Sequence, residues 1–216
     1  MATYLELQTD VINLINRSDC TTALAKTFLQ QAQRKIQRNL RIQSMEKSYQ
    51  ITAGTSGSSI YDATNGKIVI PGDFLELVYI YTDNDLLQRV PLNRFIELNT
   101  SATSTRPKYW TRIANHFHLK PVPSTGTIIT VAYHSEDTVL SADSDTNILS
   151  AIAQDLLVYG ALTYAAVYFN DQRQQLFEAK YQQIYNDVEN LIMTSDQVGA
   201  DGAIQPNMYF EKDLLN

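Results

Sequence analysis

The stretch that decides the fold is ILSAIAQDLLVYGALTYAAVYF, residues 148–169. It is apolar nearly all round, and a helix of this composition has no side that needs water. We therefore expect a helix from about 146 to 168, capped by Asp143 or Asp145, buried at the centre of a helical bundle. Small residues leave room there for close packing of neighbouring helices at Gly160, Ala161, Ala165 and Ala166.

The segment that follows predicts a helical partner for this central helix. Asn170 or Asp171 can cap it, and its apolar residues recur every three or four positions. Such a stripe favours an antiparallel hairpin with the preceding helix. The residues of the stripe are Phe177, Tyr181, Ile184, Val188 and Leu191.

Two more helices are expected at the beginning of the chain. Thr3 and Glu6 have capping-box spacing, which predicts a helix over about 3–16 with Leu7, Val11 and Leu14 on its apolar side. A second helix is expected over 21–42, with one continuous apolar stripe. That stripe consists of Ala25, Phe28, Leu29, Ala32, Ile36 and Leu40.

The middle of the chain, residues 48–138, has the pattern of an inserted β region. Short runs rich in Ile, Val, Tyr and Thr alternate with turn residues. The Asn-Gly pair at 65–66 is typical of a type I′ hairpin, and further turns are expected at 83–85 and at Asn115. These signals predict five to seven antiparallel strands, interrupted by a short helix at about 93–99.

The end of the chain differs from the rest in composition. Beyond Met193 the residues have low helix propensity and include two glycines and a proline, as flexible linkers do. Large apolar side chains then return, whereas solvated tails are normally poor in them. We expect them to dock on a partner, with folding back on the chain's own globule as the alternative. These residues are Met208, Tyr209, Phe210, Leu214 and Leu215.

The predicted fold class is therefore α+β. A bundle of about four long helices comes from residues 1–47 and 139–194, the antiparallel β region is inserted at 48–138, and a flexible linker and docking tail occupy 195–216. A chain of 216 residues buries enough surface to fold without metal or disulfide.

Composition and charge narrow the function classes. Cys20 is the single cysteine, which excludes internal disulfides and CxxC sites. A signal peptide and a membrane-spanning run are both absent from the sequence pattern, so we expect no membrane partner. The formal charge of −6 conceals opposed poles: residues 1–50 carry +3, 51–133 carry +1 and 134–216 carry −10. Such asymmetry indicates either an oppositely charged partner, an oriented assembly, or unevenly solvated faces.

Residues that could carry chemistry do not form complete sites. His116 and His118 leave the same strand face, but a third metal ligand at suitable spacing is missing. Residues 143–147 imitate the start of a calcium loop, yet Ile148 and Gln154 occupy the positions that need glycine and glutamate. Helix capping explains those residues better. We expect neither metal nor cofactor.

Enzymatic chemistry also lacks a recognisable motif. There is no nucleophile elbow, phosphate-binding loop or dinucleotide fingerprint in the sequence. Carboxylate pairs at 73 and 76, and at 83 and 85, could act as acid and base, but they resemble a turn and a strand start. We therefore expect no catalytic residue.

A basic stripe on the predicted second helix leaves three interpretations open. It could hold DNA, dock on a protein, or simply be solvated. The acidic composition and the lack of aromatic residues between the basic ones count against DNA. The stripe consists of Lys26, Arg34, Lys35, Arg38 and Arg41.

Read in order, these segments resemble the head-to-tail adaptor proteins of tailed bacteriophages, particularly short-tailed ones. The resemblance spans about residues 3–193 and depends on the order of the segments. They are YLELQTDVINLINR, LAKTFLQQAQRKIQRNLR, IPGDFLELVYIY, PKYWTRIANHFHLKPVPSTGTIITVAYH and DLLVYGALTYAAVYFNDQRQQLFEAKY.

The resemblance implies a structural virion protein in the neck between capsid and tail, made in the host cytoplasm. It implies a ring of about twelve copies beneath the portal protein, which extends the DNA channel and carries the tail nozzle or tube. The expected contact face with another subunit or the portal consists of Arg34, Lys35, Arg38 and Arg41 on the basic stripe. Genomic DNA would pass without specific binding, and we expect the acidic C-terminal third to face the channel or a basic neighbour. The rival hypotheses are an enzyme acting on glycans or nucleic acid, and a DNA-binding protein that uses the basic second helix.

Overall fold

The computed structural model describes residues 1–54, 60–62, 65–83, 85–98 and 106–199. Contacts divide the chain into two compact units, one formed by residues 1–40 with those from 140 onward, the other by Arg41–Val139. The five apolar residues expected to dock at the C-terminal end lie outside the described residues. Each unit is described separately below.

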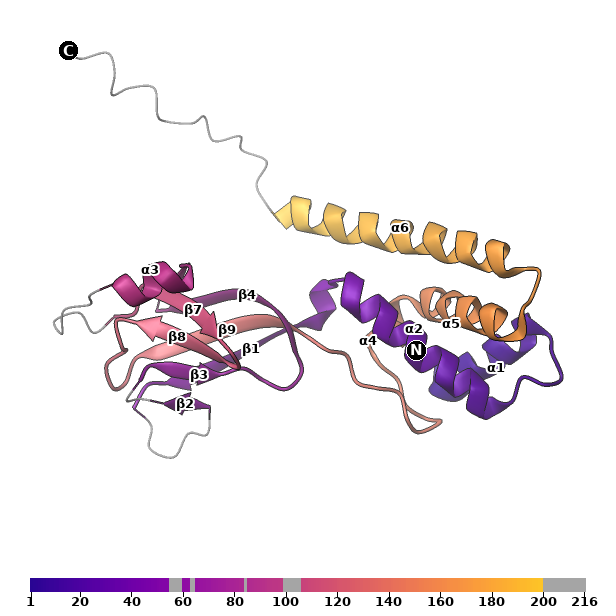
Figure 1. Ribbon diagram of the computed structural model, residues 1–216, viewed down its shortest axis with the longest axis horizontal. Coiled ribbons are helices and arrows are strands. Elements are labelled where there is room, and N and C mark those ends of the chain that lie inside the picture. Colours follow the sequence, from indigo (N-terminus) through magenta and orange to yellow (C-terminus); the bar gives the residue numbers. More distant parts are fainter. Residues whose placement is uncertain (55–59, 63–64, 84, 99–105, 200–216) are drawn as a thin grey trace, which may run out of the picture. The chain divides into compact units, whose positions relative to one another are not determined.

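The helical unit is built around one buried helix, in agreement with the prediction (Figure 1). Helix α5 packs against α1, α2 and α6, and residues on all sides of it are buried because it has almost no polar side chains. The helices of this unit are α1 (Tyr4–Ile15), α2 (Thr22–Asn39), α4 (Ile148–Ile152), α5 (Gln154–Phe169) and α6 (Gln174–Gly199).

Gly160 sets the distance between three of these helices. A Cβ atom at this position would lie 3.1 Å from the Cβ of Ala32 on α2 and 3.3 Å from Cε2 of Tyr181 on α6. Ala32 and Tyr181 are themselves buried. The small residues predicted to allow close packing therefore do so at Gly160.

The single helix expected over 146–168 is wrong in one respect, because two helices occupy this segment. Ala153 lies outside helical geometry, with φ −139° and ψ 56°, and it separates α4 from α5. Asp155 then stabilises the start of α5 by accepting a hydrogen bond from the Leu156 N–H at 2.9 Å. Alanine favours helices, so the residue itself does not signal the break.

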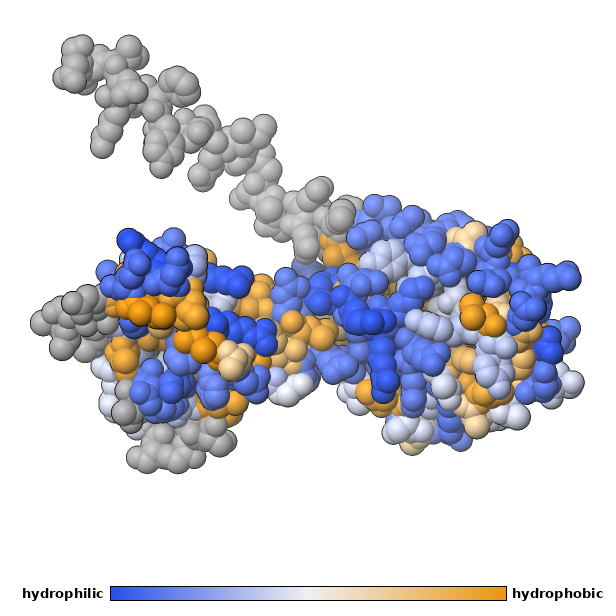
Figure 2. Space-filling view, viewed as in Figure 1, coloured by the Kyte–Doolittle hydropathy of each residue, from blue (hydrophilic) through white to orange (hydrophobic). Residues whose placement is uncertain are grey.

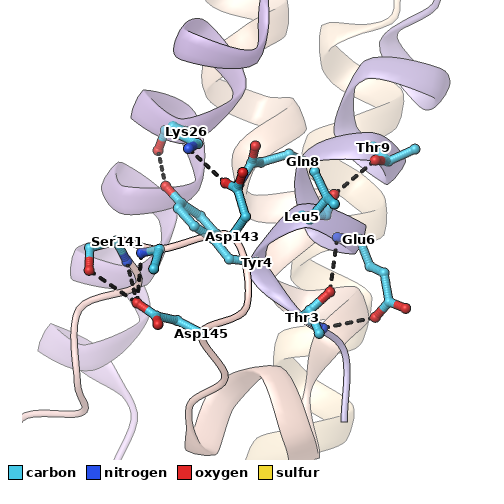
Figure 3. Close-up of polar contacts among 11 residues, drawn as sticks. Thr3, Tyr4, Leu5, Glu6, Gln8, Thr9, Lys26, Ser141, Asp143 and Asp145 are labelled. Carbon is cyan, nitrogen blue, oxygen red and sulfur yellow. Dashed lines mark hydrogen bonds and ion pairs between the residues drawn. The ribbon is translucent and has the colours of Figure 1, made fainter.

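Asp143 and Asp145 do not cap the helix as expected. The cap is Asn147, whose side chain accepts from the Ser150 N–H at 2.7 Å while the Ser150 hydroxyl accepts from the Asn147 N–H. Asp143 instead pairs with Lys26 at 2.8 Å, and Asp145 closes a turn by accepting the Ser141 and Ala142 N–H groups (Figure 3). The backbone carbonyls of 143 and 145 also accept from the N–H groups of residues 5 and 4, which ties the start of α1 to this loop.

The connection from α5 to α6 depends on an arginine that sequence reasoning did not identify. Asn170 ends α5 in the left-handed conformation and does not begin α6. Asp171 binds Arg173, whose Nη2 also donates to the Ile15 carbonyl oxygen at 2.6 Å. Arg173 thus satisfies a carbonyl at the C-terminal end of α1, which lacks a partner within its own helix.

Helix α6 confirms the predicted partner helix, with two differences. Phe177 and Tyr181 are buried as expected, but Leu191 is 71% exposed, so only the first half of the stripe packs in this unit. The helix also continues through Gly199 and therefore includes the first residues of the expected linker at 195–216. Helix propagation adds one hydrogen bond per residue, which offsets weak propensity once a helix has formed.

The second unit is a pair of β-sheets around a shared apolar core. One sheet has the strand order β1-β9-β4-β5 and the other β2-β3-β8-β7-β6. Its elements are η1 (Gln43–Met45), β1 (Glu46–Thr52), β2 (Tyr61–Asp62), β3 (Lys67–Val69), β4 (Phe74–Thr82), β5 (Asp85–Leu86), β6 (Gln88–Arg89), α3 (Leu92–Glu97), β7 (Tyr109–Ile113), β8 (His116–Lys120) and β9 (Ile128–Ser135).

Most of the predicted β features are confirmed. The turns at 83–85 and at Asn115 join paired strands, and α3 lies where the short helix was expected. Two expectations are wrong. Strands β6 and β7 run parallel, because the chain passes through α3 between them. The connection between β2 and β3 spans four residues, because Asp62 pairs with Lys67, whereas a type I′ hairpin has two loop residues.

Candidate interaction surfaces

The residues of the predicted basic stripe differ in their surroundings. Arg34 and Arg38 are exposed on α2, on the side of the helix that faces away from α5. Lys26 forms an ion pair with Asp143, so its positive charge is already balanced within the chain. The helical unit is largely hydrophilic on the side that carries α2 (Figure 2).

Lys35 and Arg41 are also engaged within the chain. The Lys35 ammonium lies 4.2 Å from the centre of the Tyr181 ring, a cation–π contact, and 3.9 Å from the Glu178 carboxylate on α6. Arg41 donates to Glu76 at 3.1 Å in the β unit. Of the expected four-residue contact face, Arg34 and Arg38 are therefore the two that present their charge to solvent.

A groove of about 450 Å³ lies in the helical unit, where α1 meets α4 and α5. Val158 and Tyr159 form part of its lining. Leu14 and Ile152 lie beside them with 44% and 52% of their surface exposed, and together they add apolar surface to the groove. This arrangement suits a partner that brings apolar surface.

Two carboxylates give the groove a negative charge. Asp10 on α1 accepts a hydrogen bond from the Gln154 amide at 3.1 Å, and Asp155 accepts from the backbone at the start of α5. Both donors are neutral, so within the described residues no cation balances either carboxylate. The groove is consequently apolar in its lining and acidic at its polar positions.

Sequence reasoning missed this groove. Leu14 was expected on the apolar side of α1, yet the buried stripe runs through Leu7, Val11 and Ile15. Leu14 lies beside this stripe and is 44% exposed. Ile152 belongs to the segment expected to be wholly buried, and the break at Ala153 places it at the surface. The one sequence feature that could have indicated the groove is the presence of Asp10 and Asp155 among these apolar residues.

The β unit contains a second pocket, of about 350 Å³, next to the first half of β4. Arg112 lies 5.3 Å from the centre of the Phe74 ring, and Arg89 lies 5.6 Å from that of Trp110. These cation–π contacts hold both guanidinium groups over the aromatic lining. The pocket therefore has its arginines in contact with its own walls.

The histidine pair does not form a metal site in the described residues. His116 and His118 have ring centres 6.3 Å apart, and clusters of three or more potential metal-binding side chains are absent from the part of the chain that the structure describes. Partial burial and the charge of Lys67 lower the pKa of His118, as expected for a neutral residue on a strand face.

The first carboxylate pair considered for acid–base chemistry, Asp73 and Glu76, has structural partners. Asp73 pairs with Lys47 at 2.8 Å and accepts from the Tyr133 hydroxyl at 3.0 Å, and these contacts lower the pKa of Asp73. Glu76, as described above, binds Arg41. Both carboxylates hold β-unit segments together.

Comparison with known proteins identifies one family. A family model described as SU10 adaptor protein matches residues 2–205, and no curated protein matches the chain. In the part of the chain that the structure describes, none of the helices combines the length and the hydropathy that crossing a membrane requires. The match covers both structural units.

Proposed function

Because the chain belongs to the SU10 adaptor protein family, a family of bacteriophage head-to-tail adaptors, we propose that it is a structural virion protein that joins the head to the tail. The observation that carries this proposal is the extent of the family match, which includes the helical unit and the inserted β unit together. The role is one of assembly, and we assign no catalytic step to any residue.

In this proposal about twelve copies form a ring under the portal protein in the virion neck. A ring subunit needs a rigid body that can pack against its neighbours. The close contacts of α5 with α2 and α6 make the helical unit such a body. The ring extends the DNA channel and gives the tail nozzle or tube a surface for attachment. The acidic C-terminal third faces the DNA channel or a basic neighbour, so that phosphates slide without being held.

The C-terminal residues provide the anchor to the portal. Met208, Tyr209, Phe210, Leu214 and Leu215 combine large apolar side chains with a preceding segment rich in small residues. Buried aromatic anchors dominate the energetics of many protein interfaces. The family match ends at residue 205, so this anchor belongs to the part of the chain beyond the matched region.

The test uses purified portal rings and compares the full chain with a variant that lacks residues 205–216. The full chain should cosediment with the portal, and the deletion should reduce the bound fraction at least tenfold. Alanine substitution at Tyr209 and Phe210 is the milder variant and should produce most of the same loss. Undiminished binding of the deletion would exclude the C-terminal anchor, whereas failure of the full chain to bind would contradict the adaptor role itself.

A further inference from the structure

We propose that the groove between α1, α4 and α5 of one copy receives the exposed arginine face of α2, Arg34 and Arg38, from a second copy. This inference rests on the ring proposed above and names the two surfaces through which neighbouring subunits meet. Three observations support it independently: the opposite charges of the two surfaces, the exposed apolar residues of the groove, and the directions in which the two surfaces face.

The first support is a pair of unmatched charges on each surface. Arg38 donates from Nε to the Arg34 backbone carbonyl at 3.3 Å, and within the described residues neither guanidinium forms an ion pair. Asp10 and Asp155 have only neutral donors there, namely an amide and a backbone N–H. Two cations on one surface and two carboxylates on another are thus complementary in sign and number.

The second support is the shape and polarity of the groove. Its volume of about 450 Å³ admits long side chains, and its exposed Leu14 and Ile152 can cover the aliphatic stems of the arginines. A guanidinium group binds a carboxylate through two parallel hydrogen bonds, and removal of water at the apolar rim strengthens this interaction. Arg34 and Arg38 lie four residues apart, one helical turn, so both can enter one groove.

The third support is that the two surfaces face in opposite directions. Ala32 on α2 and Gly160 on α5 face each other across the helix contact. Arg34 follows Ala32 by two positions, about 200° around α2, and Asp155 precedes Gly160 by five positions, about 140° around α5. Each surface therefore points away from the contact between these helices. A contact of one surface with the other is heterologous, and such contacts repeat from copy to copy and can close a ring.

The test exchanges the charges on the two surfaces. One variant carries Arg34→Glu with Arg38→Glu, and a second carries Asp10→Lys with Asp155→Lys. Each alone should raise the concentration for half-maximal assembly about tenfold or more, measured by mass photometry of the full chain with and without purified portal. An equimolar mixture of the two variants should assemble again, because every contact in an alternating ring then joins opposite charges.

Two controls keep the result interpretable. Lys180→Glu reverses an exposed charge on α6, outside both surfaces, and should assemble like the wild type. Asp10→Asn with Asp155→Asn removes the charge with little change in shape and should give a smaller loss than the lysine pair, which covers the case that the lysine variant misfolds.

The outcomes separate this inference from the proposed function. Normal assembly of either charge-reversed variant would overturn the contact while leaving the adaptor role intact. Loss in each variant without recovery in the mixture would assign these charges to another partner and would also overturn it. Wild-type protein that forms multimers neither alone nor on the portal would contradict both proposals.

Discussion

Replacing Gly160 with leucine should destabilise the helical unit, because this position is where α2, α5 and α6 approach most closely. The first added carbon alone would lie 3.1 Å from the Ala32 Cβ and 3.3 Å from the Tyr181 ring. Three more carbons have no space, so the helices must move apart or the leucine must take a strained rotamer.

The expected magnitude combines two opposing effects. Leucine favours the helix over glycine by about 1 kcal/mol, whereas overpacking of a filled core costs about 1–3 kcal/mol, and more when backbone must shift. Since Ala32 is attached directly to the backbone of α2, the shift involves a whole helix. We expect a net loss of roughly 1–2 kcal/mol, which for a unit of about 100 residues lowers the thermal midpoint by roughly 5–15 °C.

The assay follows thermal unfolding of the full chain with two signals. Circular dichroism at 222 nm reports mainly on the helices, and fluorescence reports on the β unit because Trp110 is the only tryptophan. The helical signal of Gly160→Leu should shift to lower temperature. Gly160→Ala should be close to neutral, because the gain in helix propensity and the close contact oppose each other.

A matched control and a rescue make the result specific. Gly72→Leu introduces the same side chain where nothing lies within 4 Å, and it should leave the helical midpoint unchanged. Ala32→Gly removes the nearest carbon and should cost less in the Gly160→Leu background than alone, with a coupling of about 1 kcal/mol. An unchanged helical midpoint in Gly160→Leu would refute the packing described for α5.

Two further predictions concern ionisation. In Arg173→Ala, loss of the donor to the Ile15 carbonyl should lower the thermal midpoint by a few degrees. The pKa of Asp171, which Arg173 holds at about 2, should rise towards 3.8 in an NMR titration. A pKa that stays near 2 in this variant would contradict the prediction. Because that pKa is depressed in the folded state, its stabilisation is present above pH 4 and is lost as pH falls towards 2. Burial raises the pKa of Tyr181 to about 12, and burial together with Asp73 raises that of Tyr133 to about 12. The two neutral tyrosines therefore favour folding below pH 10, and this contribution is lost between pH 10 and 12. Absorbance titration at 295 nm should show late ionisation of these tyrosines, and a single midpoint near 10 in the folded protein would exclude it.

The hydrophobic pattern within single segments made the helical unit predictable. The composition of residues 148–169 admits burial on every side, and this was sufficient to place the central helix and its partners. Turn chemistry likewise placed Asn115 between two strands. These features depend on local sequence alone, which is why no tertiary information was needed.

Features that depend on tertiary contacts were not predictable. Asp143 has the right residue type for a helix cap, but its carboxylate gains more from Lys26, a residue 117 positions away in sequence. The break at Ala153 has no sequence signal, and the exposure of Ile152 follows from it. The division of strands between two sheets also depends on pairing that composition does not encode.

In the candidate surfaces, too, local sequence predicted some features and tertiary contacts determined the others. Clustering of basic residues on α2 was evident, but which of them keep a free charge depends on Glu178, Tyr181 and Glu76, all distant in sequence. Arg34 and Arg38 are the members of the expected four-residue face that form no ion pair within the described residues. The groove lined by Asp10 and Asp155 was not evident from residue patterns alone.

Electron microscopy of purified portal rings incubated with the full chain tests the central claim most directly. The adaptor account predicts a second ring of density on one end of each portal, with about twelve copies related by the portal's own rotational symmetry. Portals that remain unchanged at saturating protein concentration, or protein bound at random positions without symmetry, would contradict the account.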